Sequence, residues 1–218
     1  MRILNLRTKF ERFCYRNRNK GIPNLMLYIN IGAAIVYVLS LINGGSILYE
    51  YLRFDKAAIL QGQVWRLFTY VFTYTPGDGF LTLIFLYFFY RIGQQVEQSM
   101  GTFRFNLYYF SGILLMDIFA MIFCPTANVL VQGTLVPVEY FTYLIYGRMA
   151  YNMHLCLLLA FATMHPDARF LVLFIIPVKA WFLGVVYLVL TGIEIINLTT
   201  GLMLFPHNLF PLVALLNY

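Results

Sequence analysis

Long apolar stretches constrain the fold of this chain more than any other feature. Of its 218 residues, 61% are hydrophobic and 11% are charged, whereas a soluble domain carries about 25% charged residues. A helix that crosses the hydrocarbon core of a bilayer needs about 20 apolar residues, or as few as about 17. Because the apolar runs are continuous and do not alternate with polar residues, helices are predicted rather than a barrel. The sequence predicts an all-α integral membrane bundle of six transmembrane helices, at Leu25–Asn43, Phe80–Val96, Phe105–Phe123, Met149–Met164, Phe170–Leu190 and Leu202–Tyr218.

The basic residues are concentrated at the N-terminus. Seven of the fifteen Lys and Arg residues lie in the first twenty positions: Arg2, Arg7, Lys9, Arg12, Arg16, Arg18 and Lys20. A basic segment before a first span is the usual positive-inside signal, so residues 1–24 are expected to form a basic cytoplasmic tail. Six spans would return the C-terminus to the cytoplasm as well. The net charge of +6 is therefore explained by topology and does not indicate nucleic-acid binding.

The same tail has an alternative use. It would lie on anionic lipid, with Phe10, Phe13 and Tyr15 touching the interface. At the level of sequence, this role and a simple topogenic role both remain open. In either case the lipid bilayer is an expected partner.

The connections between the predicted spans differ in length and composition. The longest, Ser46–Gly79, is rich in aromatic and aliphatic residues at helical spacing, which is typical of short amphipathic helices in the outer interface. The second outer loop is predicted at Cys124–Arg148. Short turns are predicted at Gly93–Phe105 and His165–Arg169 on the inner side, and at Asn197–Gly201 on the outer side.

Two motifs carry a family resemblance. The run Gly62-Gln63-Val64-Trp65-Arg66-Leu67-Phe68-Thr69 resembles the Trp-Arg motif of the rhomboid and derlin superfamily. The turn from Glu97 through Gly101 to Phe105 resembles that superfamily's E-x-x-x-G-x-x-[KR]-F element between spans two and three. The resemblance implies that residues 25–218 form a rhomboid-like membrane domain with a long interfacial first outer loop.

The motif residues have plain structural roles beside the family one. Trp65 and Arg66 can be an interfacial tryptophan and a snorkelling arginine, or they can fix a loop that is half-sunk in the outer leaflet. Glu97 is expected to accept backbone N–H bonds at a helix start, and Gly101 to ease the turn.

The resemblance also implies a peptidase site, and this chain departs from it. Active rhomboids pair a Ser in G-x-S-G, at the start of span four, with a His on span six, and a His-x-x-x-Asn on span two supplies oxyanion donors. Here Leu81 and Phe85 replace the two donors, and the span-four region, taken as Tyr151–Leu157, holds neither Gly nor Ser. No serine follows Ser111 anywhere in the chain. We therefore expect no intact catalytic set.

His207 is nearest to the family position of the base on span six. The glycines that follow that base in the family are missing, because Gly201 is the last glycine of the chain. Such glycines allow two helices to approach closely in lipid.

A cysteine nucleophile is an alternative. Cys156 would use His154 or His207 as its base. Burial among leucines disfavours a thiolate, and His154 is two residues away on a different helix face. A small packing residue is the favoured interpretation of Cys156.

Asp117 is the one carboxylate expected inside the membrane. Such residues often mark ion or proton pathways, which keeps a small transporter among the hypotheses. The favoured alternative is an Asp that is neutral or hydrogen-bonded to Tyr109, Ser111 or His154. The His and Cys residues show no metal-ligand spacing, so no metal and no cofactor are expected.

These features predict a catalytically inactive rhomboid pseudoprotease. By family analogy it is expected to bind the transmembrane helices of client proteins for membrane-protein quality control or degradation, together with a partner protease or ATPase. Two alternatives remain: an active rhomboid-family intramembrane peptidase with a non-standard site, and a small transporter that uses Asp117. The expected location is a bacterial cell membrane, with both termini cytoplasmic.

Overall fold

The structure is a computed structural model that describes residues 2–42, 46–73, 79–131, 133–172, 176–202 and 209–215. Its longer helices are α1 (Arg2–Arg16), α2 (Leu25–Ile42), α6 (Phe80–Met100), α7 (Thr102–Phe123), α8 (Met149–Met164) and α9 (Ala180–Leu202). The shorter helices are α3 (Ser46–Leu52), α4 (Lys56–Leu60), α5 (Arg66–Thr69), η1 (Tyr70–Thr73), η2 (Tyr140–Ile145), η3 (Tyr146–Arg148) and α10 (Phe210–Leu215). Two antiparallel hairpins complete it: β1 (Val129–Val131) with β2 (Thr134–Val136), and β3 (Arg169–Val172) with β4 (Ile176–Lys179).

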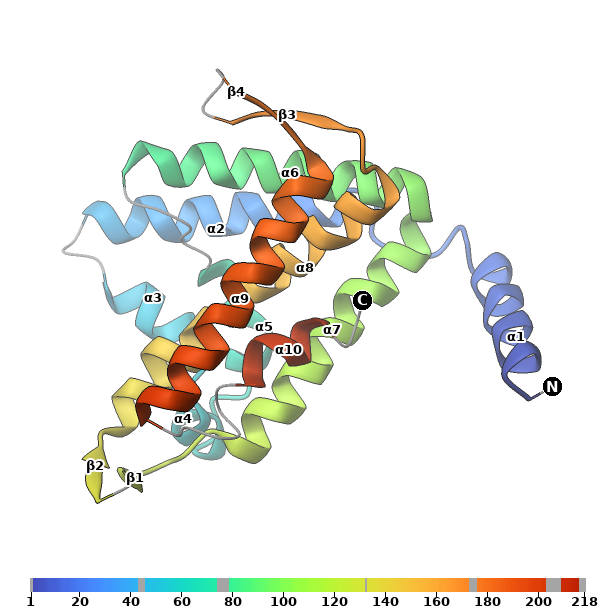
Figure 1. The fold of residues 1–218 in the computed structure, drawn as a ribbon. Coiled ribbons are helices and arrows are strands. Elements are labelled where there is room, and N and C mark those ends of the chain that lie inside the picture. Colours follow the sequence, from blue (N-terminus) through green and yellow to red (C-terminus); the bar gives the residue numbers. More distant parts are fainter. Residues whose placement is uncertain are drawn as a thin grey trace.

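Helices α2 and α6 run side by side across the top of Figure 1. Gly93 permits this approach, because a Cβ there would lie 2.2 Å from Cγ of Met26. Small residues at such crossings are typical of helices packed in lipid. Gly93 therefore belongs to a helix–helix contact and not to the turn predicted at Gly93–Phe105. That turn is a single residue, Gly101, whose φ of 85° lies in the left-handed region that favours glycine.

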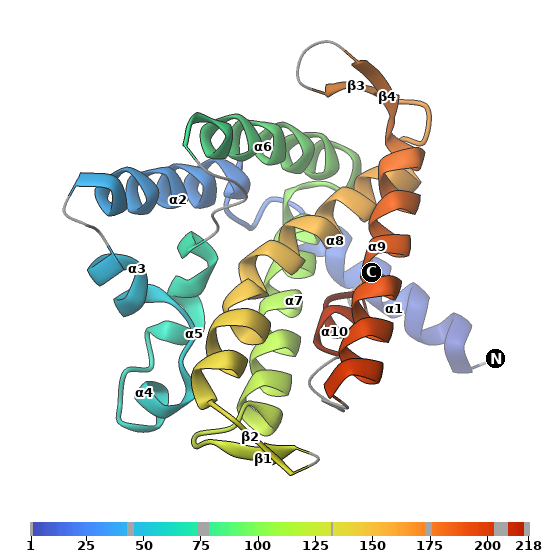
Figure 2. The ribbon, with the colours of Figure 1, turned by 60° about the vertical axis from the view of Figure 1, so that its left-hand side comes forward.

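Helix α8 is the centre of the bundle. It packs against α6, α7 and α9, and Figure 2 shows it between them. Gly184 of α9 lies against Ala162 of α8, where a Cβ would come within 3.1 Å of the alanine methyl group. Most of α8 is buried as a result, and its side chains dominate one continuous apolar core.

Three helical stretches are long and apolar enough to cross a membrane: α2, α7 and the continuous run Tyr140–Met164. They correspond to the first, third and fourth predicted spans. Helix α6 covers the second, but its apolar part, Phe80–Tyr90, is roughly 16 Å long at 1.5 Å per residue. Helix α9 contains a shorter apolar stretch, Ala180–Ile193. The structure thus describes a helical membrane bundle, and the number of six spans stays a prediction.

The predicted fifth span, Phe170–Leu190, is wrong in its first part. Residues 170–172 and 176–179 belong to the β3–β4 hairpin, in which Phe170 pairs with Val178 and Leu171 with Pro177. Proline disrupts a helix interior, which explains why the helix begins only at Ala180. Lys179 is consequently outside a span. It is exposed and forms an ion pair with Asp167, with a distance of 3.1 Å between Nζ and Oδ1.

Three other predicted boundaries also need correction. The outer turn predicted at Asn197–Gly201 is part of α9, which continues to Leu202. Within the predicted span Leu202–Tyr218, the described helix is α10, and Pro206 and His207 lie outside the described residues. The second loop, predicted at Cys124–Arg148, is helical from Tyr140 onward and leads directly into α8. The two hairpins also qualify the all-α prediction.

The basic tail contains helix α1, which lies to one side of the other helices in Figure 1. Its contact with the bundle is made by Phe13, whose ring meets Phe103 at a centroid distance of 5.6 Å, and by the buried Cys14. Phe10 and Phe13 are half exposed.

Candidate functional site

The family's peptidase site is formed by spans two, four and six, which correspond here to α6, α8 and the predicted final span, whose described helix is α10. On α6, Leu81, Phe85 and Phe88 follow one stripe at i, i+4 and i+7. Phe88 packs on Phe170 of β3 with a ring-centroid distance of 4.9 Å. Leu81 and Phe85 are 45% and 39% exposed, which places them at the surface of the bundle. Neither side chain can donate a hydrogen bond to an oxyanion.

Helix α8 has the bounds predicted for the fourth span, Met149–Met164. Gly147 and Arg148 lead into it, and Met149 and Ala150 are its first residues, so Tyr151–Leu157 lie within the helix and not at its start. Met149 and Ala150 are buried at 1% and 2% exposure. Gly147 is retained here and Arg148 follows it, but the next two positions, Met149 and Ala150, hold apolar side chains that fill the core. None of the four residues from Gly147 to Ala150 carries a hydroxyl or a thiol group.

His154 is fully buried one turn further along α8. Its Nδ1 lies 2.8 Å from the carbonyl oxygen of Ala150, and its ring packs edge-on against Phe89 with a centroid distance of 5.2 Å. The imidazole is thus held by its own helix and by α6. Cys156 is buried at 1% exposure on α8 and is a free cysteine. The third residue of the alternative site, His207, lies outside the described residues.

The Trp-Arg motif has a defined structural role. Its side chains bind the C-terminal carbonyl groups of α3, which have no partners inside the helix. Arg66 Nη1 donates to the carbonyl oxygens of Glu50 (2.6 Å) and Arg53 (2.9 Å). Trp65 Nε1 donates to Tyr51 O at 3.4 Å, and its ring lies 5.1 Å from that of Tyr51.

Thr69, one turn further along, completes this set. Its Oγ1 donates to Leu52 O at 2.8 Å, so four consecutive carbonyl groups, of residues 50–53, are capped by Trp65, Arg66 and Thr69. Burial lowers the pKa of Arg66, and Asp55 opposes that shift. Arg66 is only 7% exposed, so its side chain holds α3 against α5 through hydrogen bonds and does not snorkel toward water.

Glu97 and Gly101 join the α6–α7 turn to the start of α2. Glu97 Oε1 accepts hydrogen bonds from the backbone N–H of Asn24 (3.1 Å) and from Thr102 Oγ1 (2.9 Å). Asn106 adds a reciprocal pair with Ile22: its Oδ1 accepts from the backbone N–H at 2.9 Å, and its Nδ2 donates to the carbonyl at 3.0 Å. The motif therefore fixes where the tail enters the bundle.

Asp117 has a neighbour that the sequence did not indicate. The expected partners were Tyr109, Ser111 and His154, but the carboxyl group lies beside Tyr70 of η1, which is distant in sequence. Burial raises the pKa of Tyr70 well above its ordinary value, and Asp117 adds to the shift. Within the described residues, Asp117 Oδ1 and the hydroxyl groups of Tyr70 and Tyr109 make no hydrogen bond of ordinary geometry.

A second contact that the sequence did not indicate links the segment 46–73 to η2. Tyr143 donates from its hydroxyl to Glu50 Oε1 at 2.6 Å, and the Arg53 guanidinium lies 3.9 Å from the centre of the Tyr143 ring. Only the concentration of tyrosines in both loops hinted at such a contact. Among the described residues, no group of three His, Cys, Asp or Glu side chains could hold a metal ion.

A family model of the rhomboid domain matches residues 61–205 of the chain. The chain belongs to the rhomboid family. That match includes Trp65, Arg66, Glu97 and Gly101, and it ends just before His207. No curated protein and no solved structure gives a significant match. The protein is thus a rhomboid-like membrane protein, and its chemistry must be argued from its own residues.

Proposed function

We propose that this rhomboid-family protein is a pseudoprotease that binds transmembrane helices of client proteins and does not cleave them. The observation that carries the proposal is the apolar, buried start of α8, where Met149 and Ala150 stand in place of an activated nucleophile. Hydrolysis needs a nucleophile, a base and oxyanion donors together. Removal of one oxyanion donor alone costs about 2.7–4 kcal/mol of barrier. Leu81 and Phe85 offer no replacement donor.

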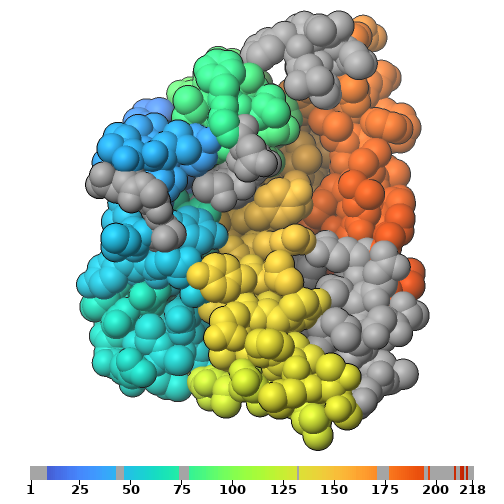
Figure 3. Space-filling model, turned by 90° about the vertical axis from the view of Figure 1, so that its left-hand side faces the viewer, coloured from blue at the N-terminus to red at the C-terminus, as the bar shows by residue number. Residues whose placement is uncertain are grey.

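Client binding is supported by the surface between α6 and α9. In Figure 3, atoms of α8 are visible between those of α6 and α9. Near one end, Phe170 of β3 packs on Phe88 of α6 and on Phe161 of α8. Toward the other end of α6, Leu81 and Phe85 are exposed. An apolar client helix that approaches from the bilayer would meet this surface first.

The segment 46–73 gives a second line of support. It is held rigid by the capping of residues 50–53, yet it exposes Ile47 (80%), Leu60 (65%), Val64 (59%) and Phe68 (64%). Such side chains are placed favourably in the bilayer interface and not in water. We infer that the segment is half-sunk in the outer leaflet.

The short apolar part of α6 adds a reason why clients would move near the protein. Its length of roughly 16 Å, at 1.5 Å per residue, is about half of a 30 Å hydrocarbon core. Such a mismatch thins the lipid around the helix. Thinner lipid lowers the cost of exposing the polar residues of a misfolded client helix. This action fits quality control or degradation, with a partner protease or ATPase removing the client.

Photo-crosslinking tests this proposal. Benzoylphenylalanine at Leu81 should crosslink a labelled transmembrane helix in proteoliposomes, and an excess of unlabelled helix should compete. The matched control is the same probe at Ile31 of α2, which is 49% exposed against 45% for Leu81. Equal crosslinking from both positions, or none from Leu81, would refute the proposed client surface.

A transporter is a second candidate because the carboxyl group of Asp117 lies beside the buried hydroxyl group of Tyr70, which in turn is close to Tyr109. It predicts uptake or proton flux in proteoliposomes that Asp117→Asn abolishes. The pseudoprotease proposal predicts no such flux in either protein.

A further inference from the structure

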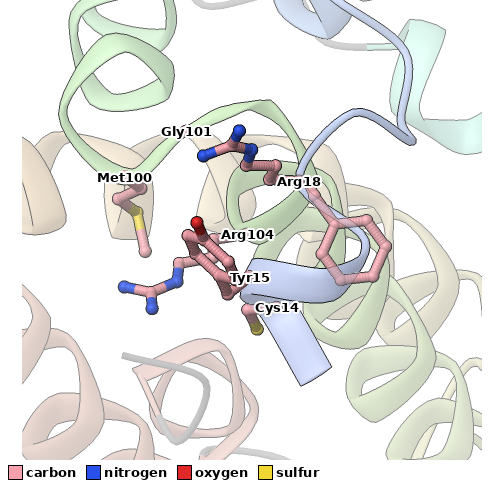
Figure 4. A pocket seen from close by; sticks show the side chains of 7 residues that line it. Cys14, Tyr15, Arg18, Met100, Gly101 and Arg104 are labelled. Atoms are coloured by element: carbon pink, nitrogen blue, oxygen red, sulfur yellow. The ribbon is translucent and has the colours of Figure 1, made fainter. Parts of the chain in front are cut away.

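A shallow pocket lies where α1 meets the turn between α6 and α7. It has a volume of roughly 170 Å³ and is lined by Cys14, Tyr15, Arg18, Met100, Gly101, Phe103 and Arg104. In Figure 4 the Tyr15 hydroxyl lies between the guanidinium groups of Arg18 and Arg104. The proposed client surface does not include any of these residues.

The pocket is strongly cationic on one side. The Arg18 guanidinium carbon lies 4.9 Å from the centre of the Tyr15 ring, a contact that holds the guanidinium beside the hydroxyl group. Neither Arg18 nor Arg104 forms an ion pair with any residue in the described parts of the chain. Two guanidinium groups and a phenol hydroxyl are hydrogen-bond donors suited to a phosphate group.

The other side of the pocket is apolar. Met100, Phe103 and Cys14 supply it, and the edge-on contact of Phe13 with Phe103 holds α1 in place. Gly101 contributes backbone only, and nothing lies within 4 Å of the position that a Cβ would take there. A ligand that fits this pocket combines an anionic group with apolar atoms.

The position of the pocket in the fold indicates where such a ligand would come from. Helix α7 is long and apolar enough to cross a membrane, and it begins at Thr102, so Gly101 and Arg104 lie at the level of lipid headgroups. The positive-inside rule assigns this end to the cytoplasmic leaflet. That leaflet is rich in anionic lipid, which attracts basic segments.

We propose that this pocket binds the phosphate headgroup of an anionic phospholipid, with Arg18 and Arg104 on the phosphate and Met100 and Phe103 against the glycerol and the first acyl carbons. Tyr15 donates its hydroxyl to the same phosphate. The bound lipid fixes α1 against the bundle. This site is independent of the proposed client binding.

Native mass spectrometry of the full chain in detergent tests the site. Short-chain phosphatidylglycerol should bind at one saturable site, and phosphatidylcholine at least tenfold more weakly. The double variant Arg18→Gln/Arg104→Gln should weaken phosphatidylglycerol binding about 25-fold, from the contribution of two basic residues near an anionic surface. The variant Arg12→Gln/Arg16→Gln removes the same charge from exposed positions of α1 that do not line the pocket, and should change binding less than threefold.

Equal weakening in both double variants would show only diffuse attraction and would overturn the site. Binding that does not saturate would do the same. The last experiment is a competition with inorganic phosphate. If phosphate displaces the lipid at an equal concentration, the pocket recognises a free anion and the lipid assignment is wrong. All four arginines are exposed, so the variants are expected to fold, which thermal unfolding of each variant will verify.

Discussion

Replacement of Arg66 by alanine should release the segment 46–73 from its folded form. The guanidinium makes three hydrogen bonds, to Gln63 Oε1 (2.7 Å), Glu50 O (2.6 Å) and Arg53 O (2.9 Å). A hydrogen bond to a charged group contributes about 1.5–3 kcal/mol. Three such bonds set an upper range of about 4.5–9 kcal/mol, and water can rehydrate part of a segment at the interface. We therefore expect a loss of about 3–5 kcal/mol in the free energy of local opening.

Hydrogen exchange measured by mass spectrometry reads this quantity directly. Each 1.4 kcal/mol is a factor of ten, so a loss of about 3 kcal/mol accelerates exchange of amides in residues 46–73 more than roughly 100-fold. Arg66→Lys keeps the positive charge but not the planar set of N–H donors of the guanidinium group. It should therefore recover about half of the lost free energy of local opening. Thr69→Val removes a single bond and should cost about 1 kcal/mol.

Arg91→Ala is the matched control, because among the described residues this exposed arginine bonds only to Gln94 on its own helix. It should change exchange in residues 46–73 less than twofold. The capping argument is refuted if Arg66→Ala behaves like this control.

Three further predictions concern the bundle itself. Glu97→Ala removes the acceptor for the Asn24 N–H and should lower the free energy of unfolding by about 2–4 kcal/mol, seen as a lower Tm in detergent; an unchanged Tm would contradict the role of the motif. Gly93→Leu places a side chain against Met26, although even a Cβ at position 93 would lie only 2.2 Å from Met26 Cγ, so the variant should push α2 and α6 apart. A longer distance between spin labels on the two helices would detect this separation. Asp117→Asn should change the free energy of unfolding by less than about 1 kcal/mol, because the amide is close in shape to the carboxyl group; a loss above about 3 kcal/mol would reveal a charge that the fold depends on.

The sequence predicted the parts of the fold that depend on local composition. Apolar length located α2, α7 and α8 to within a few residues, because a helix in lipid must satisfy its own backbone and bury apolar side chains. It failed where a single residue decides between two local structures. Pro177 stands in an apolar run and excludes a helix there, and the run forms a hairpin instead. Gly93 was interpreted as part of a turn, although its lack of a side chain serves a helix crossing.

The candidate site depended more on long-range contacts, which one sequence cannot reveal. The motif identified Arg66 as important, but its carbonyl partners at residues 50 and 53 became visible only when α3 and α5 were placed together. Tyr70 was not expected beside Asp117, because 46 intervening residues separate them in the chain. The fourth span was predicted at the bounds that α8 has, but the family's serine position was sought at Tyr151–Leu157, because the helical segment that precedes α8, Tyr140–Arg148, has no clear sequence boundary with it.

Cleavage of a transmembrane substrate is the most direct test of the central claim. The full chain should be reconstituted in proteoliposomes with a fluorescent substrate whose transmembrane helix carries helix-destabilising residues. We predict no cleavage above that of empty liposomes, together with saturable binding of the same substrate. Cleavage by the wild-type chain that disappears in Cys156→Ala or His207→Ala would contradict this prediction and show that a non-standard peptidase site operates in this fold.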